Sequence, residues 1–357
     1  MRRFQGALVV CTLLIGYASL YPFVPLRLPG EDALAAFFLR PRHVVSFDIW
    51  VNVLAYVPLG ALACHRFRQG GSAHPIRLAL AFAAALSLLL EVCQLFIPTR
   101  VGTIFDVVAN VAGAGLGILA FVEPVHSLVT RPLTEMRDRL FTPGLWGDAG
   151  LVLVVLWLLA QLNPALPFFG AGNIVEGVAD HGDAALLQMI AVGMSICGFA
   201  LFVSSIMRGA GGALRVTLIL LSIALWLKFV AGSFMLKPHF SAEWVSSGRM
   251  VGLAAGLLAF IPMRRLGRLA RVYLAIVLVL AGALFAKIFG AYSAIDELLR
   301  LFSWPHGQLA GFATLTRFLH ELWPFAALVF LIGLFFHTRK ISTLLENTQA
   351  LRPQDIR

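Results

Sequence analysis

Long apolar runs, separated by short groups of charged residues, Pro and Gly, follow one another along most of this sequence. Most runs approach the roughly 20 residues that an α-helix needs to cross the hydrocarbon core of a bilayer. The pattern therefore predicts an all-α, polytopic transmembrane bundle of about ten helices, with most consecutive helices antiparallel. The predicted spans are 5–22, 48–65, 76–97, 105–122, 150–168, 184–207, 215–236, 248–263, 271–290 and 317–336.

Basic residues are concentrated in alternate loops between these spans. Arg66 and Arg68 stand in one such loop, and Arg264, Arg265 and Arg268 stand in another. Cytoplasmic loops of membrane proteins carry this excess of Lys and Arg, so we predict that both termini are cytoplasmic. The intervening loops are poorer in base and richer in acid, and we expect them to face outward.

The longest charged loop divides the sequence into two parts. We predict a module of four spans at 1–122, a cytoplasmic linker at 123–149 and a second module of roughly six spans at 150–340. The remaining residues, 341–357, are predicted to form a cytoplasmic tail.

The composition agrees with a membrane protein and excludes several other classes. Apolar residues make up 59% of the chain and charged residues 13%, whereas soluble proteins contain about 25% charged residues. The net charge of +10 comes without a basic stripe that has aromatic residues interleaved, so nucleic acid is not an expected partner. The four cysteines stand singly, which favours small buried residues over a disulfide framework or a metal site.

One short motif occurs twice. Phe47-Asp48-x-x-x-Asn52 reappears as Phe105-Asp106-x-x-x-Asn110, and each copy opens an apolar run. Residues four apart share one face of a helix, so Asp and Asn of each copy are expected to act together. A carboxylate at the mouth of a membrane helix is costly to place, so its repetition indicates a specific role.

The predicted topology brings both copies of the motif to one face of the membrane. Spans 48–65 and 105–122 both run inward from the outer face, and the span between them runs outward. The end of that middle span carries Glu91, Gln94 and, just beyond it, Arg100 to the same level. We therefore expect an outer-face cluster of carboxylates, amides and one arginine.

Small residues on the second copy's helix predict close helix packing. Gly113 and Gly117 continue the helical stripe that begins with Asp106 and Asn110. A Gly-x-x-x-Gly pair lets a second helix backbone approach closely in a membrane. The polar end of this stripe should thus face protein instead of lipid.

These motifs carry a resemblance to a known family. They are Asp48-x-x-x-Asn52 with Ala55-Tyr56-Val57-Pro58-Leu59-Gly60, then Glu91-x-x-Gln94-x-x-x-Pro98-x-Arg100, then Asp106-x-x-x-Asn110-x-x-Gly113-x-x-x-Gly117. In this order and spacing they resemble the VanZ-like family of small bacterial membrane proteins, over residues of about 5–122. The family is named for a protein linked to teicoplanin resistance, so the resemblance implies a fold and a bacterial envelope location instead of a reaction. The later spans carry no motif of that family.

If the cluster is functional, its residues divide into two roles. The carboxyl groups would act as general acid or base, and the other polar groups would bind substrate, with the arginine holding a phosphate or carboxylate. The catalytic candidates are Asp48, Asp106 and Glu91, and the binding candidates are Asn52, Asn110, Gln94, Arg100 and Tyr56. In the structural alternative, the same groups cap helix ends or bond across helices and only join them.

Other polar residues are weaker candidates. Lys228 and Lys287 fall within predicted spans, and an intramembrane lysine is a candidate for function. His239 and Glu243 share a helical spacing, but they fall in a predicted loop. No histidine accompanies the repeated motif and no nucleotide-binding or familiar hydrolase motif is present, so neither a metal nor a cofactor is predicted.

The sequence therefore predicts a multi-pass protein of the bacterial inner membrane, in contact with membrane lipids. The hypothesis is that it binds or modifies a lipid-linked or amphiphilic envelope substrate, with glycopeptide susceptibility as one property that this could affect. The alternatives are a transporter or flippase component, which an intramembrane lysine would support, and a non-catalytic membrane scaffold. The sequence does not decide whether the protein is an enzyme, and it assigns neither an oligomeric state nor a role to 150–340.

Overall fold

A computed structural model shows the fold of this chain. It describes residues 5–39, 46–122, 125–166, 182–235, 247–289 and 306–350. Side chains at several of these ends, including those of Asp48 and Lys287, lie outside the described part. Within the described ranges the regular structure is helical, apart from an isolated bridge between Phe141 and Met207. The all-α class predicted from the apolar pattern is confirmed.

Twelve α-helices occur in the described ranges, and every predicted span falls on one of them. They are α1 (Gln5–Leu20), α2 (Ala33–Phe38), α3 (Ser46–Gln69), α4 (Pro75–Gln94), α5 (Ile104–Ile118), α6 (Arg131–Leu140), α7 (Leu145–Ala160), α8 (Gly182–Ile206), α9 (Ala213–Met235), α10 (Ser247–Met263), α11 (Arg268–Phe289) and α13 (His306–Ala350). A 3₁₀ turn at Leu119–Phe121 and a π-helical turn at His126–Thr130 stand between α5 and α6. Six helices in these ranges are long and apolar enough to cross a membrane, and α1, α7 and α10 are shorter apolar helices.

The bounds of α13 differ most from the prediction. The apolar pattern indicated a span at 317–336 and a tail from 341, whereas α13 begins at His306 and continues to Ala350. The stretch 338–350 contains neither Gly nor Pro, the two residues that most disfavour a helix interior. The helix therefore extends beyond its apolar part, and a search for apolar runs alone does not detect that extension.

The chain divides into two compact units. The first contains 1–139 and 304–315, and the second contains 140–303 and 316–357. The change from one unit to the other between Arg139 and Leu140 falls inside the segment 123–149, for which a linker was predicted.

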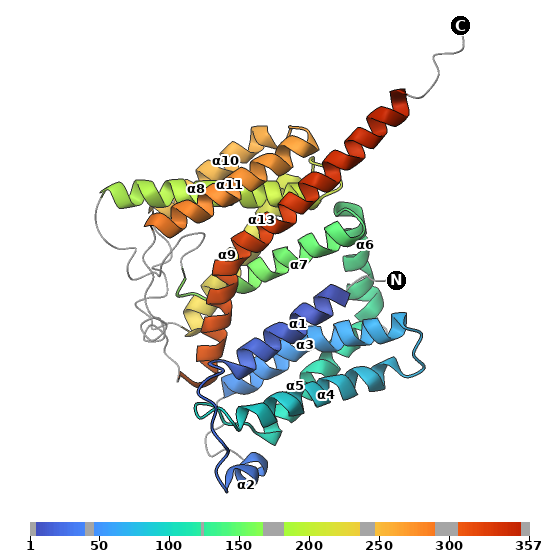
Figure 1. The fold of residues 1–357 in the computed structure, drawn as a ribbon, viewed down its shortest axis with the longest axis vertical. Coiled ribbons are helices and arrows are strands. Elements are labelled where there is room, and N and C mark those ends of the chain that lie inside the picture. The colour runs from blue at the N-terminus through green and yellow to red at the C-terminus, as the bar shows by residue number, and fades with distance from the viewer. Residues whose placement is uncertain are drawn as a thin grey trace. The chain divides into compact units, whose positions relative to one another are not determined.

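In the first unit, α3, α4 and α5 lie side by side, as Figure 1 shows. A methyl group at Gly113 would overlap the carbonyl oxygen of Val53, and one at Gly117 would overlap that of Val57. Since residue numbers rise together along this contact, α3 and α5 run parallel with their backbones in close contact. This geometry is typical of small-x-x-x-small packing between membrane helices, and it brings the first turns of both helices to one end of the unit.

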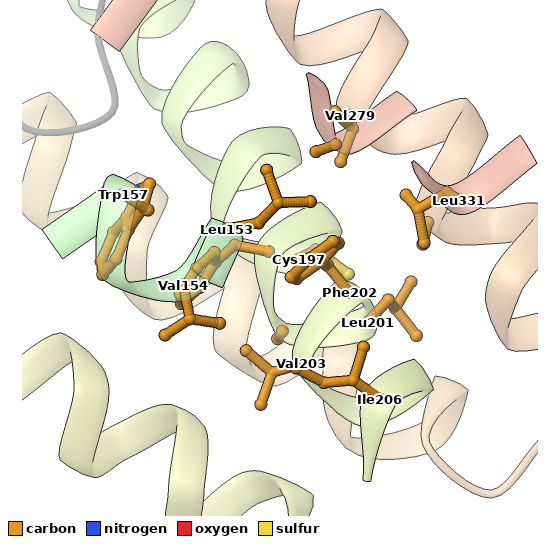
Figure 2. Packing of buried hydrophobic residues seen from close by; sticks show 14 of the residues in the cluster. Leu153, Val154, Trp157, Cys197, Leu201, Phe202, Val203, Ile206, Val279 and Leu331 are labelled. Atoms are coloured by element: carbon orange, nitrogen blue, oxygen red, sulfur yellow. The ribbon is translucent and has the colours of Figure 1, made fainter. Parts of the chain in front are cut away.

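The second unit has its core where α7, α8, α9, α11 and α13 meet. Figure 2 shows Leu153, Val154 and Trp157 of α7 near Cys197 and Phe202 of α8, within one cluster of buried side chains. A separate glycine stripe packs α10 against α8 in parallel orientation. It consists of Gly248, Gly252 and Gly256, which lie against Ala185, Met189 and Gly193.

Candidate functional site

The N-terminus of α5 is closed by a local hydrogen-bonded pair. Thr103 precedes the helix as its N-cap, and its hydroxyl accepts a hydrogen bond of 3.1 Å from the backbone amide of Asp106. The same hydroxyl donates a bond of 2.9 Å to one oxygen of the Asp106 carboxylate. This arrangement is a variant of the capping box, in which residues three apart satisfy each other at a helix start. The free amide groups at this end also favour a negative charge there.

Asn52 of α3 approaches the same carboxylate from the neighbouring helix. Its side-chain amide donates a bond of 2.6 Å to the second oxygen of Asp106. The carboxylate is thus bonded on both oxygens, and its position is fixed by two separate elements. The amide of the first motif copy therefore binds the carboxylate of the second.

Glu91, in the last turn of α4, lies on the other side of the cap. Its side chain is only 4% exposed, and one carboxylate oxygen accepts a bond of 3.0 Å from the backbone amide of Thr103. Asp106 and Arg100 are close enough for their charges to act on Glu91. Two carboxylates therefore bracket one threonine at a helix N-terminus, and a pair in such a setting suits general acid–base chemistry.

Arg100 and Gln94 bind the end of α1. The guanidinium of Arg100 donates bonds of 2.9 Å to the carbonyl oxygen of Tyr21 and 3.0 Å to that of Ala18. The side chain of Gln94 donates a bond of 3.1 Å to the carbonyl oxygen of Ser19. The last carbonyl groups of a helix lack partners within it, and they favour a cation nearby. These two side chains thus cap α1 and hold it beside the cluster.

The polar cluster continues one helical turn deeper between α3, α4 and α5. The side chain of Asn110 donates a bond of 2.9 Å to the hydroxyl of Ser87. The buried hydroxyl of Tyr56 lies beside Ser87, but it makes no well-formed hydrogen bond with the described residues. The side-chain oxygen of Asn110 likewise has no hydrogen-bond donor in the described part of the chain. Buried polar atoms without partners call for an explanation, such as an ordered water or a bound polar group.

The structure brings together most of the residues singled out from the sequence, and it adds two. Asp48 belongs to the first turn of α3, but its side chain lies outside the described part. Thr103 and Ser87 were missed. Thr103 stands three residues before Asp106 ahead of an apolar run, which is the sequence signature of a helix cap. Ser87 stands four residues before Glu91, on the same helical face.

A second polar site lies in the other unit around Lys228. This side chain is 1% exposed, and its ammonium donates bonds of 2.8 Å to the carbonyl oxygens of both Asn163 and Leu166. Asn163 in turn bonds to Thr316 at 3.1 Å. The lysine thus satisfies carbonyl groups of the turn after α7, which apolar surroundings would otherwise leave without partners.

The side chain of Lys287 and the residues His239 and Glu243 lie outside the described residues.

The apolar helices, with polar side chains gathered between them, define a multi-pass helical membrane protein. Residues 7–127 match the model of the VanZ/LLP1 family, and no family model matches the rest of the chain. The resemblance inferred from the three motifs is therefore confirmed, and the matched segment contains the whole polar cluster of the first unit. No curated protein and no solved structure matches this chain.

Proposed function

We propose that the VanZ-like part of this protein binds the polar head group of an amphiphilic or lipid-linked substrate of the bacterial cell envelope. The site is the polar cluster at the end of the first unit where α5 begins. The observation that carries the proposal is the pair of carboxylates, Glu91 and Asp106, on either side of Thr103. The topology predicted from the basic loops assigns this end to the outer face of the inner membrane.

The chemistry of the surroundings suits an amphiphile. Trp50 and Leu54 of α3 and Val108 of α5 are exposed large apolar side chains near the first turns of these helices. They offer a surface for acyl chains beside the polar cluster. The hydroxyl of Tyr56 and the side-chain oxygen of Asn110 offer a donor and an acceptor for a head group. A ligand with both parts would satisfy both kinds of surface.

Within this site, Asp106 and Glu91 are the acid–base candidates. Asn52 and Thr103 hold the Asp106 carboxylate on both oxygens, which fixes its direction relative to the head group. Fixed orientation is what positioned acid–base groups require. Arg100 serves here as a positioning residue because its bonds to α1 keep that helix beside the cluster.

A scaffold function is the second candidate, and a specific observation favours it. Residues of the three sequence motifs form hydrogen bonds that cap α5, cap α1 and join α3 to α5. All of these bonds lie within the protein. Such bonds stabilise a bundle whether or not a ligand binds.

A third candidate is a transporter or flippase component, favoured by the buried Lys228 of the second unit.

The deciding experiment uses a bacterial strain that lacks its own copy of the gene and carries variants instead. Asp106→Asn, Glu91→Gln, Asp48→Asn and Arg100→Lys are compared with the natural sequence for protein level in the membrane, envelope stress and glycopeptide susceptibility. Leu116→Ala, at an exposed position near the opposite end of α5, is the control.

We expect the carboxylate variants to lose function, as measured by envelope stress and glycopeptide susceptibility, while their protein level in the membrane stays normal. Loss of the protein in every variant would instead support the scaffold. A normal phenotype at normal level in all four would reject the proposed site.

A further inference from the structure

The segment between α5 and α7 has an exposed apolar stripe. Val129, Leu133 and Met136 are 50%, 55% and 51% exposed. Their spacing of four and three residues places them on one face of a helix. Exposed large side chains in a continuous stripe differ from the scattered apolar residues of an ordinary surface. We therefore expect this stripe to contact another molecule or a membrane.

A row of charged residues lies on another face of the same helix. Glu135 forms ion pairs of 3.0 Å with Arg131 and 3.9 Å with Arg139, and both arginine side chains are largely exposed. Arg137 is far less exposed and pairs with Asp138 at 2.6 Å. Arginine is thus in excess over acid on α6, and the two exposed arginines share the face of Glu135, about a third of a turn around the helix from the apolar stripe.

The span that precedes this segment ends in exposed apolar residues. Leu116, Leu119 and Val122, at the end of α5 and just after it, are exposed apolar residues, and Ile104–Phe121 is long and apolar enough to cross a membrane. The hydroxyl of Thr130 donates a bond of 2.7 Å to the carbonyl oxygen of Ala120 and ties the π-helical turn to this end of α5. The segment is therefore held where the span leaves the membrane.

We propose that 126–140 is an interfacial helix that binds the anionic phospholipid surface of the surrounding membrane. The stripe of Val129, Leu133 and Met136 enters the boundary between head groups and acyl chains, and Arg131 and Arg139 reach the phosphate groups. Helices with one apolar face and basic residues on the polar face lie in the membrane plane in this way. The charged linker predicted from the sequence is thereby assigned to the membrane surface instead of to water.

The test uses the full-length protein in vesicles, with one cysteine in a background where the four native cysteines are replaced by alanine. A polarity-sensitive fluorophore is attached at Met136→Cys and, as the matched control, at Thr134→Cys on the polar face of α6. Vesicles contain phosphatidylcholine alone or phosphatidylcholine with phosphatidylglycerol. Each variant must first elute as a single symmetric peak in detergent.

We expect blue-shifted emission at Met136→Cys that brominated lipids quench, and water-like emission at Thr134→Cys. The embedded fraction at Met136→Cys should rise with phosphatidylglycerol. Arg131→Gln and Arg139→Gln should each lower the ratio of embedded to water-exposed fluorophore roughly fivefold in these anionic vesicles, because a basic residue at such a surface contributes about this factor. Arg131→Lys and Arg139→Lys should retain the effect.

Two outcomes would overturn the proposal. Water-like emission at Met136→Cys in both kinds of vesicle would show that the stripe does not enter the membrane. An embedded fraction at Met136→Cys that changes neither with phosphatidylglycerol nor with either Gln substitution would show that the arginines have no such role and that anionic lipid is not preferred.

Discussion

The side-chain amide of Asn52 donates a hydrogen bond of 2.6 Å to the carboxylate of Asp106 and so joins the two copies of the repeated motif. In the second copy, the side-chain amide of Asn110 donates a hydrogen bond to the hydroxyl of Ser87. The repeat is therefore similar in sequence but different in bonding. Its second copy also has Thr103 as a cap where the first has Val45 at the matching position.

Removal of the Asn52 amide should destabilise the first unit. In Asn52→Leu the carboxylate of Asp106 keeps its bonds to Thr103 but loses its donor from α3. Loss of one hydrogen bond to this charged carboxylate should lower the free energy of unfolding by about 1–3 kcal/mol. The apparent melting temperature in detergent should fall, whereas Leu54→Ala, at an exposed position of the same helix, should leave it nearly unchanged. Equal melting temperatures for Asn52→Leu and the natural protein would contradict the link.

The cap of α5 should depend on a hydroxyl at position 103. Thr103→Ala removes the bonds to the amide and carboxylate of Asp106, and loss of an N-cap costs about 1 kcal/mol. Thr103→Ser keeps the hydroxyl and should restore most of the stability. Thr99→Ala, in the exposed loop before the cap, serves as the control in the same melting experiment. If Ser and Ala at position 103 behave alike, the hydroxyl has no such role.

The contact between α3 and α5 should tolerate no side chain at Gly117. A methyl group there would overlap the carbonyl oxygen of Val57, so Gly117→Ala should force the helices apart and reduce folded protein in the membrane. Gly115→Ala is the matched control on the same helix because nothing lies within 4 Å of its added methyl group. Fluorescence-detected gel filtration measures both variants. A normal amount of folded Gly117→Ala would show that this contact is looser than described.

Much of the first unit could be predicted because its signals are local. The position of each apolar run gave a helix, and Gly113-x-x-x-Gly117 correctly indicated close packing of its helix against another backbone. The partners of the polar side chains were harder to predict. A guanidinium binds an anion or a row of carbonyl groups equally well by its donor geometry, so the sequence favoured a substrate anion for Arg100. The structure shows this residue on the carbonyl groups that end α1.

The second unit shows why other contacts lie beyond sequence reasoning. Lys228 is recognisable as a buried charge, but its partners are backbone carbonyl groups of the turn after α7, and every residue type offers such a group. No pattern of side chains marks Asn163 or Leu166 as the acceptors. The contact depends on where the turn lies beside α9, which is decided by packing across the whole unit.

The capping role of Arg100 leads to a prediction that separates stability from ligand binding. Arg100→Met leaves the carbonyl groups of Ala18 and Tyr21 without these donors, at about 1–3 kcal/mol for each unsatisfied group. We expect a lower melting temperature and faster proteolysis after α1, with partial rescue by Arg100→Lys. Arg27→Met, an exposed arginine in the following loop, is the control. Full stability of Arg100→Met together with a lost envelope phenotype would instead favour an anion ligand.

The last prediction concerns the side of the membrane on which the polar cluster lies. The loop 95–103 connects α4 to α5 beside the cluster, and Thr99 is exposed in it. The loop between α3 and α4 lies at the opposite ends of these helices and contains the exposed Ala73. In intact cells, a membrane-impermeant maleimide should label Thr99→Cys but not Ala73→Cys, and disruption of the membrane should make both reactive. The basic residues beside Ala73, including Arg68 and Arg77, motivate this orientation through the excess of positive charge in cytoplasmic loops. Labelling of Ala73→Cys alone in intact cells would invert the topology and place the proposed site on the cytoplasmic face.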